Sequence, residues 1–288
     1  MAETWKRIWT YVVLVAVFSA AFYFLILGVA HQVRGAHGYY VQGIMWMPAL
    51  AAFVACRLRK KPLSELGFGW PATRYVLIAW LLPLAYCLLA YLPVWLSPWG
   101  GFYDHEFVES MSRNFGTSGL PVALQIAFYV LLAGTLGVIR STNSLGEEIG
   151  WRGYLVPELA KVMPFGGVVA FTAVLWVLYH APALIFADYN AGAPWWWSLL
   201  SFSLLCLFGC VAFAWLRLRS GSVWPAAILH ASHNTFVQQV FDPLTVDTGR
   251  TRWLITEFGL ALALAMGVAA LWFWRRRGEL ASPSPSPA

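Results

Sequence analysis

Charged residues are scarce in this chain. Asp, Glu, Lys and Arg make up only 11% of its 288 residues, whereas hydrophobic residues make up 60%. Soluble globular domains carry roughly 25% charged residues, and disordered chains are poor in large apolar residues. The composition therefore excludes both classes. A mean hydropathy of +0.64 and an aromatic content of 17% are instead typical of an integral membrane protein.

Cysteines are few, and two common hydrolase signatures are absent. The four cysteines fall in apolar stretches, which predicts small packing residues and argues against a disulfide or metal framework. They are Cys56, Cys87, Cys206 and Cys210. The sequence contains no G-x-S-x-G and no H-E-x-x-H motif. Neither an exposed nucleophilic serine nor a zinc-binding helix of that metalloprotease type is therefore indicated.

Long apolar runs are what the sequence has in abundance. Because a transmembrane helix needs about 20 apolar residues, they predict an all-α fold, a polytopic bundle of about eight transmembrane helices. The spans are expected near residues 9–30, 39–56, 75–96, 120–139, 165–186, 196–216, 222–241 and 253–274. A further helix is expected near 145–160. The first run is longer than a signal-peptide core, so we interpret it as a retained helix.

The distribution of basic residues predicts the orientation. Fourteen are expected on one side, namely Lys6, Arg7, Arg57, Arg59, Lys60, Lys61, Arg74, Arg140, Lys161, Arg217, Arg219 and Arg275 to Arg277. Only Arg34, Arg113, Arg250 and Arg252 are expected on the other side. This bias places both termini in the cytoplasm, so the helix near 145–160 should face the cytoplasm or re-enter. It also explains the net charge of +6, so no nucleic-acid partner is needed.

A single membrane-embedded domain is expected over residues 1–280, within the lipid bilayer of the cell membrane. No linker divides it, and no internal repeat supports a transporter built from inverted repeats. Residues 281–288 alternate between Ser and Pro after Ala281, a composition typical of a disordered tail.

Two adjacent carboxylates, Glu147 and Glu148, stand out in this apolar setting. Ionised groups lose several kcal/mol of hydration on burial, so they persist where they have partners or a function. Neighbouring helical residues point about 100° apart, whereas Glu148 and Arg152 lie at i and i+4 and can pair. Glu147 is then left for another role, such as a general base. A cluster of interfacial charges at a helix start is the alternative.

Histidines on two other apolar helices could supply the partners. His180 lies near the end of one helix, and His230 and Asn234 share a face of another, with His233 beside them. Helix–helix hydrogen bonds or an interfacial histidine would also account for them. Together with Glu147, however, they could converge on one wet cavity, activate a water molecule and stabilise an oxyanion, as amide hydrolysis requires.

The order of these motifs resembles that of a known family. E-E-x-x-x-R, then F-x-x-x-H, then H-x-x-x-N are hallmarks of the CAAX prenyl protease and bacteriocin-processing family of intramembrane proteases (CPBP, abortive-infection). Here they read Glu147-Glu148…Arg152, Trp176…His180 and His230…Asn234, within residues 119–241. These residues would form the protease core. Trp176 replaces the usual Phe, which we expect to change only the shape of the cavity.

The resemblance implies roles for these residues. Glu147 and His180 would activate the water, His230 and Asn234 would stabilise the oxyanion, and Glu148 and Arg152 would support them. Family members have also been described as metal-dependent, in which case Glu147, His180 and His230 would hold zinc and leave one position for water. The sparse ligand set favours the metal-free scheme without deciding the matter.

The expected function is cleavage of a peptide bond in a membrane-associated substrate. The resemblance allows a CAAX-type prenylated, lipidated protein C-terminus or a small peptide, reached through a cavity that faces the cytoplasm. A transporter or proton relay remains an alternative, because intramembrane Glu and His also mark ion pathways. A catalytically silent membrane scaffold is the other.

Overall fold

The protein is all-α, as predicted. The computed structural model describes residues 1–28, 36–141 and 143–280. The two strands in this part of the chain, β1 (Gly101–Phe102) and β2 (Thr245–Val246), pair antiparallel with Gly101 opposite Val246. The predicted disordered tail at 281–288 lies outside the described residues, as do residues 29 and 30 of the first expected span.

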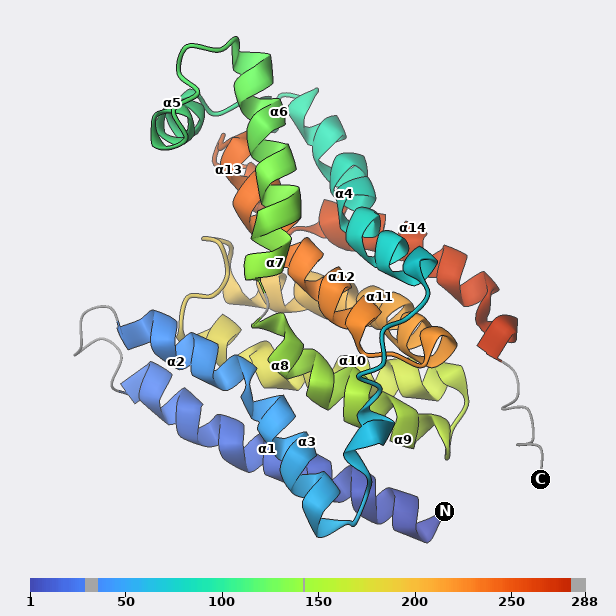
Figure 1. The fold of residues 1–288 in the computed structure, drawn as a ribbon. Coiled ribbons are helices and arrows are strands. Elements are labelled where there is room, and N and C mark those ends of the chain that lie inside the picture. Colours follow the sequence, from blue (N-terminus) through green and yellow to red (C-terminus); the bar gives the residue numbers. More distant parts are fainter. Residues whose placement is uncertain (29–35, 142, 281–288) are drawn as a thin grey trace.

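The helices follow one another with short connections (Figure 1). They are α1 (Ala2–Gly28), α2 (Ala36–Met45), α3 (Met47–Leu58), α4 (Thr73–Trp95), α5 (His105–Asn114), α6 (Val122–Leu132), α7 (Val138–Arg140), α8 (Ser144–Glu148), α9 (Val156–Ala160), α10 (Phe165–Phe186), α11 (Trp195–Ser220), α12 (Trp224–Asn234), α13 (Asp242–Leu244) and α14 (Leu260–Arg275). Three π-helices, η3 (Ala133–Gly137), η4 (Ile149–Leu155) and η5 (Thr235–Phe241), join α6 to α7, α8 to α9 and α12 to α13. Short 3₁₀ turns are η2 (Leu63–Leu66), η6 (Thr251–Trp253) and η7 (Arg277–Leu280).

Six helices in the described residues are long and apolar enough to cross a membrane. They are α1, Tyr39–Leu58, α4, Val122–Arg140, α10 and α11, and α14 is a shorter apolar helix. The predicted count of eight is not confirmed. The stretch expected at 222–241 is divided between α12 and η5, and the one expected at 253–274 becomes α-helical only at Leu260.

Apolar side chains cover the outside of the bundle as well as its core. On α14, Leu264, Val268 and Leu271 recur at i, i+4 and i+7, and all are more than half exposed. Such a stripe faces water unfavourably but suits the hydrocarbon of a bilayer. The pattern supports a multi-pass membrane protein.

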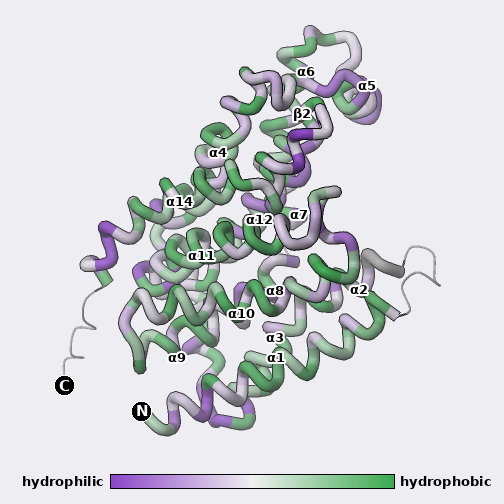
Figure 2. The backbone as a smooth tube through the Cα atoms, turned by 180° about the vertical axis from the view of Figure 1, so that it is seen from behind, coloured by the Kyte–Doolittle hydropathy of each residue, from purple (hydrophilic) through white to green (hydrophobic). Residues whose placement is uncertain are grey.

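Basic residues gather at one end of the bundle, where both chain termini also lie (Figure 1). We call this the basic end; its members are Lys6, Arg7, Arg57, Arg59, Lys60, Lys61, Arg74, Lys161, Arg217, Arg219 and Arg275 to Arg277. Contacts between segments hold it together. Arg59 Nε donates to Thr10 Oγ1 over 2.8 Å, and Arg219 lies 3.6 Å from the Glu279 carboxylate. Figure 2 shows hydrophilic residues near both termini, and again over α5.

Lys61 organises the inner part of the basic end. Its ammonium donates to Glu65 over 2.6 Å and to the buried Glu158 over 2.7 Å, and Lys161 also donates to Glu158. The hydrogen bond from Lys61 holds the pKa of the Glu65 carboxyl below its ordinary value. These contacts fix the C-terminal end of α9 beside η2.

Arg140 does not belong to the basic end, contrary to the predicted topology. The neighbouring Ser141 lies 3.1 Å from Thr235 Oγ1. Thr235 follows α12, whose first residue, Trp224, donates to the Phe68 carbonyl near the basic end. Since α12 has 11 residues and rises about 1.5 Å per residue, Arg140 lies well away from that end.

The segment that carries the acidic pair runs through the interior. Residues 144–159 are buried except Leu145 and Pro157, which are half-buried. The expectation that this helix faces the cytoplasm or re-enters is wrong for these residues. Glycines allow the close approach to α3: a Cβ at Gly146 would lie 2.6 Å from the Met45 carbonyl oxygen, and one at Gly150 would lie 2.5 Å from Pro48 Cβ. Small residues let helices pack closely where lipid provides no hydrophobic driving force.

Gly150→Ala is therefore expected to destabilise the protein by about 1–3 kcal/mol, because the added methyl overlaps the Pro48 backbone. Thermal unfolding in detergent measures the effect as a lower Tm. Gly119→Ala is the control, since nothing lies within 4 Å of a Cβ at Gly119. Equal Tm values for the two variants would contradict this account of the packing.

Candidate active site

Glu148 is the centre of a buried ion-pair network. Its Oε1 accepts from Arg152 Nη1 over 2.9 Å and from His230 Nδ1 over 2.8 Å. Both carboxylate and guanidinium are buried. The predicted i, i+4 pairing of Glu148 with Arg152 is confirmed. The bond to His230 also ties α8 to α12, which the sequence pattern did not predict.

Aromatic rings enclose the Arg152 guanidinium. Its central carbon lies 4.3 Å from the centroid of the Trp176 ring and 4.1 Å from that of Phe213. Arginine stacks well on aromatic faces, and the attraction is stronger away from water. On the other side Arg217 Nε donates to the Arg152 carbonyl over 2.8 Å. The cation is thus held by one acid and two rings.

Trp176 also reaches the first glutamate. Its indole Nε1 donates to Glu147 Oε2 over 3.2 Å. Phenylalanine has no donor that could make this bond. The expectation that Trp176 changes only the cavity's shape is therefore incomplete, because the indole also orients the Glu147 carboxylate.

The two histidines are held in defined protonation patterns. His180 Nδ1 lies 2.9 Å from the Trp176 carbonyl oxygen. Because a carbonyl only accepts, Nδ1 carries the proton, and Nε2 is left as an acceptor. His230 Nδ1 faces Glu148, and an ionised carboxylate likewise only accepts. Nδ1 of His230 is therefore the protonated nitrogen too.

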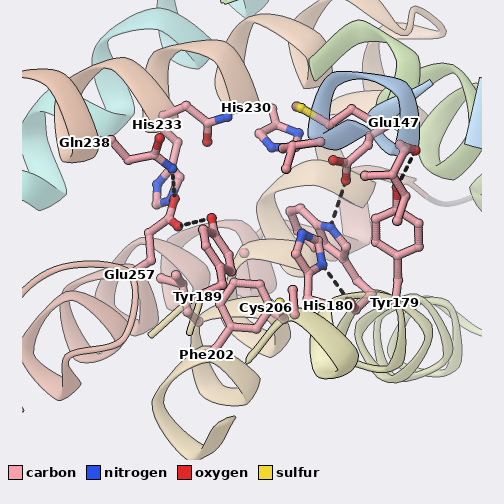
Figure 3. A pocket seen from close by; sticks show the side chains of 18 of the residues that line it. Glu147, Tyr179, His180, Tyr189, Phe202, Cys206, His230, His233, Gln238 and Glu257 are labelled. Atoms are coloured by element: carbon pink, nitrogen blue, oxygen red, sulfur yellow. Dashed lines mark hydrogen bonds and ion pairs between the residues drawn. The ribbon is translucent and has the colours of Figure 1, made fainter. Parts of the chain in front are cut away.

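The three motifs meet at one cavity of about 400 Å³. Glu147, Trp176, His180, His230 and Asn234 all line it, whereas Glu148 and Arg152 lie behind its wall. Figure 3 shows Glu147, His180 and His230 around one part of the cavity. The sequence expectation that these side chains converge is thus met by their placement. The remaining wall is mainly apolar and aromatic.

A second polar cluster lines the same cavity, and the sequence analysis missed it. Glu257 accepts from Gln238 Nε2 over 2.8 Å and from Tyr189 Oη over 2.9 Å, and it lies 3.2 Å from His233 Nε2. His233 Nδ1 is 2.6 Å from Tyr86 Oη. Figure 3 shows this group apart from Glu147 and His180. The available signal was Glu257 itself, an acid inside a predicted apolar span.

The residues do not form a metal site as placed. Among the residues that the structure describes, no group of three or more His, Cys, Asp or Glu side chains could hold one metal ion. Glu147, His180 and His230 line one cavity but do not converge as ligands. The described cysteines are free and buried, as expected of packing residues.

Comparison with known proteins agrees with the motifs. Residues 119–236 match a family model described as Type II CAAX prenyl endopeptidase Rce1-like. No curated protein matches the chain. The matched stretch includes the acidic pair, Trp176 with His180, and His230 with Asn234. The resemblance to the CAAX protease family is confirmed for this part of the chain, and at family level it supports an intramembrane protease.

Arg152→Met is expected to lower the free energy of unfolding by about 3–5 kcal/mol, because it leaves the buried Glu148 carboxylate without its cation. Thermal unfolding in detergent should show a clearly lower Tm. The control is Arg113→Met, which removes an exposed i, i+4 partner of Glu109 at 3.5 Å and should cost at most about 1 kcal/mol. Similar losses in the two variants would contradict the role assigned to burial.

Proposed function

We propose that the protein is an intramembrane endopeptidase that hydrolyses a peptide bond of a membrane-associated substrate by means of an activated water molecule. The observation that carries the proposal is the meeting of Glu147, His180, His230 and Asn234 at one cavity inside an apolar bundle. Water and a peptide can reach polar groups there that lipid would otherwise exclude. The family match supports the same class of reaction.

Glu147 and His180 activate the water. The Trp176 indole binds one oxygen of Glu147, so the carboxylate is oriented and retains acceptor capacity for a proton from water. His180 offers Nε2 as a second acceptor, because its Nδ1 is engaged with the helix backbone. Two fixed acceptors orient the water and remove its proton as it attacks the carbonyl carbon.

His230 and Asn234 stabilise the oxyanion. Asn234 can donate through its amide, whereas His230 can donate through Nε2 only as an imidazolium, since its Nδ1 proton is given to Glu148. The charges then balance: Arg152 and His230 are positive, and Glu147 and Glu148 are negative. Donors fixed in a water-poor site stabilise a developing negative charge strongly. Proton transfer to the departing amine completes the cleavage.

The cavity wall fits an apolar peptide or a lipidated one. Ile44, Phe202, Leu205 and Met266 are buried or nearly so, and they line the cavity beside the polar groups. Apolar walls with a few fixed polar groups are typical of ligand sites. We propose a small peptide or a CAAX-type prenylated C-terminus as the substrate.

Glu147→Gln is expected to lower the cleavage rate by about 10²–10⁴-fold, because the amide cannot accept the proton from water. The measurement uses purified protein in detergent with a quenched fluorescent peptide set that includes prenylated members. Glu109→Gln, at an exposed position, is the control and should keep full activity. A chelator should leave the rate unchanged. Cleavage by Glu147→Gln at the rate of the unmodified protein would exclude this mechanism, and a silent scaffold would show no cleavage in any variant.

Trp176→Phe is expected to lower kcat roughly 10-fold with little change in KM, because a hydrogen bond to a carboxylate is worth about 1.5 kcal/mol or more. The aromatic face over Arg152 is kept in this variant. Trp224→Phe is the matched control, since its indole donates to the Phe68 carbonyl far from the cavity. If both substitutions left kcat unaltered, the indole of Trp176 would have no part in positioning Glu147.

A further inference from the structure

The cavity lies in the half of the bundle away from the basic end. α1 begins at the basic end and lines the cavity only through Tyr23 and Ile26, near its other end. α10 begins beside α14's last turn, where the Phe165 and Trp274 rings are 5.8 Å apart. It lines the cavity from Trp176 onward.

The exposed part of the lining marks the mouth. Val41, Asp188, Tyr189 and Gln238 are the exposed residues of the lining. Asp188 and Tyr189 follow the end of α10, Val41 lies in α2, and Gln238 lies in η5, beyond Asn234 as seen from the basic end. All four positions lie at the opposite end of the bundle, which we call the distal end.

The way from the basic end is blocked by packed side chains. Arg152, Tyr154 and Leu155 are almost fully buried between Glu147 and that end, and Lys61 and Glu158 close it with an ion pair of 2.7 Å. Fourteen residues separate Glu147 from Lys161. At about 1.5 Å per residue this is roughly 20 Å of filled interior.

The charge distribution orients these two ends. The basic end carries thirteen Lys and Arg residues, named above, whereas the described distal half carries Arg113, Arg140, Arg250 and Arg252. Positively charged loops remain in the cytoplasm. Moving Arg140 out of the predicted cytoplasmic set leaves this bias intact. The basic end is therefore cytoplasmic, and the distal end is not.

We propose that the catalytic cavity is reached from the non-cytoplasmic side of the membrane, so that the substrate is an exported or outer-leaflet peptide segment. A prenylated C-terminus in the cytoplasm would face the closed end of the bundle. The proposal rests on the proposed function for its peptide substrate, but the direction of access does not. It corrects the expectation of a cavity that faces the cytoplasm.

Labelling of single cysteines tests the direction of access. In a variant with Cys56, Cys87, Cys206 and Cys210 replaced by Ala, three positions each receive one cysteine. Gln238→Cys reports on the mouth, Ser110→Cys on the distal surface at α5, and Ser64→Cys on the basic end. All three positions are exposed. Intact cells and permeabilised cells are then treated with a membrane-impermeant maleimide.

The expected result is labelling of Gln238→Cys and Ser110→Cys in intact cells, and of Ser64→Cys only after permeabilisation. Labelling of Ser64→Cys alone in intact cells would reverse the orientation and overturn the proposal. So would labelling of Ser110→Cys in intact cells without labelling of Gln238→Cys, because the mouth would then not open at the distal end. No cleavage is measured, so this result stands or falls separately from the peptidase activity.

Discussion

The Glu148 carboxylate is the constraint on which the rest of the site depends. A negative charge buried among apolar helices requires compensation at short range. Arg152 and His230 provide it, so α8, η4 and α12 must meet at this point. Arg152 in turn selects the aromatic rings of Trp176 and Phe213. The residues that would touch substrate are therefore held by a residue that does not line the cavity.

The sequence was sufficient for the chemistry that repeats along a helix. The i, i+4 spacing of Glu148 and Arg152, and that of His230 and Asn234, places each pair on one face whatever surrounds it. Apolar composition likewise predicts a helical membrane protein, because backbone groups in lipid must be satisfied within each span. Local rules of this kind need no knowledge of neighbours.

What could not be predicted depends on contacts between distant segments. Glu257 meets His233 and Tyr189 only because the loop before α14 folds against η5. The burial of residues 144–159 depends on the approach of α3 to Gly146 and Gly150, and hydropathy gives no sign of it. Span counting failed at 222–241 for a related reason. Polar residues that serve the cavity lower the apolar signal of the helix that carries them.

Two of the π-helices begin directly after motif residues. η4 starts after Glu148, and η5 starts after Asn234. A π-turn holds more residues than an α-turn, so it shifts the angular phase of everything that follows. Each motif helix is thereby uncoupled from its continuation: the first part is aimed at the cavity, and the second is rotated to suit its own neighbours. Removal of one residue from η5 would restore α-helical phase and turn Gln238 away from Glu257, while His230 and Asn234 kept their direction. Chain length in these two short segments is therefore as strictly constrained as the identity of the motif residues.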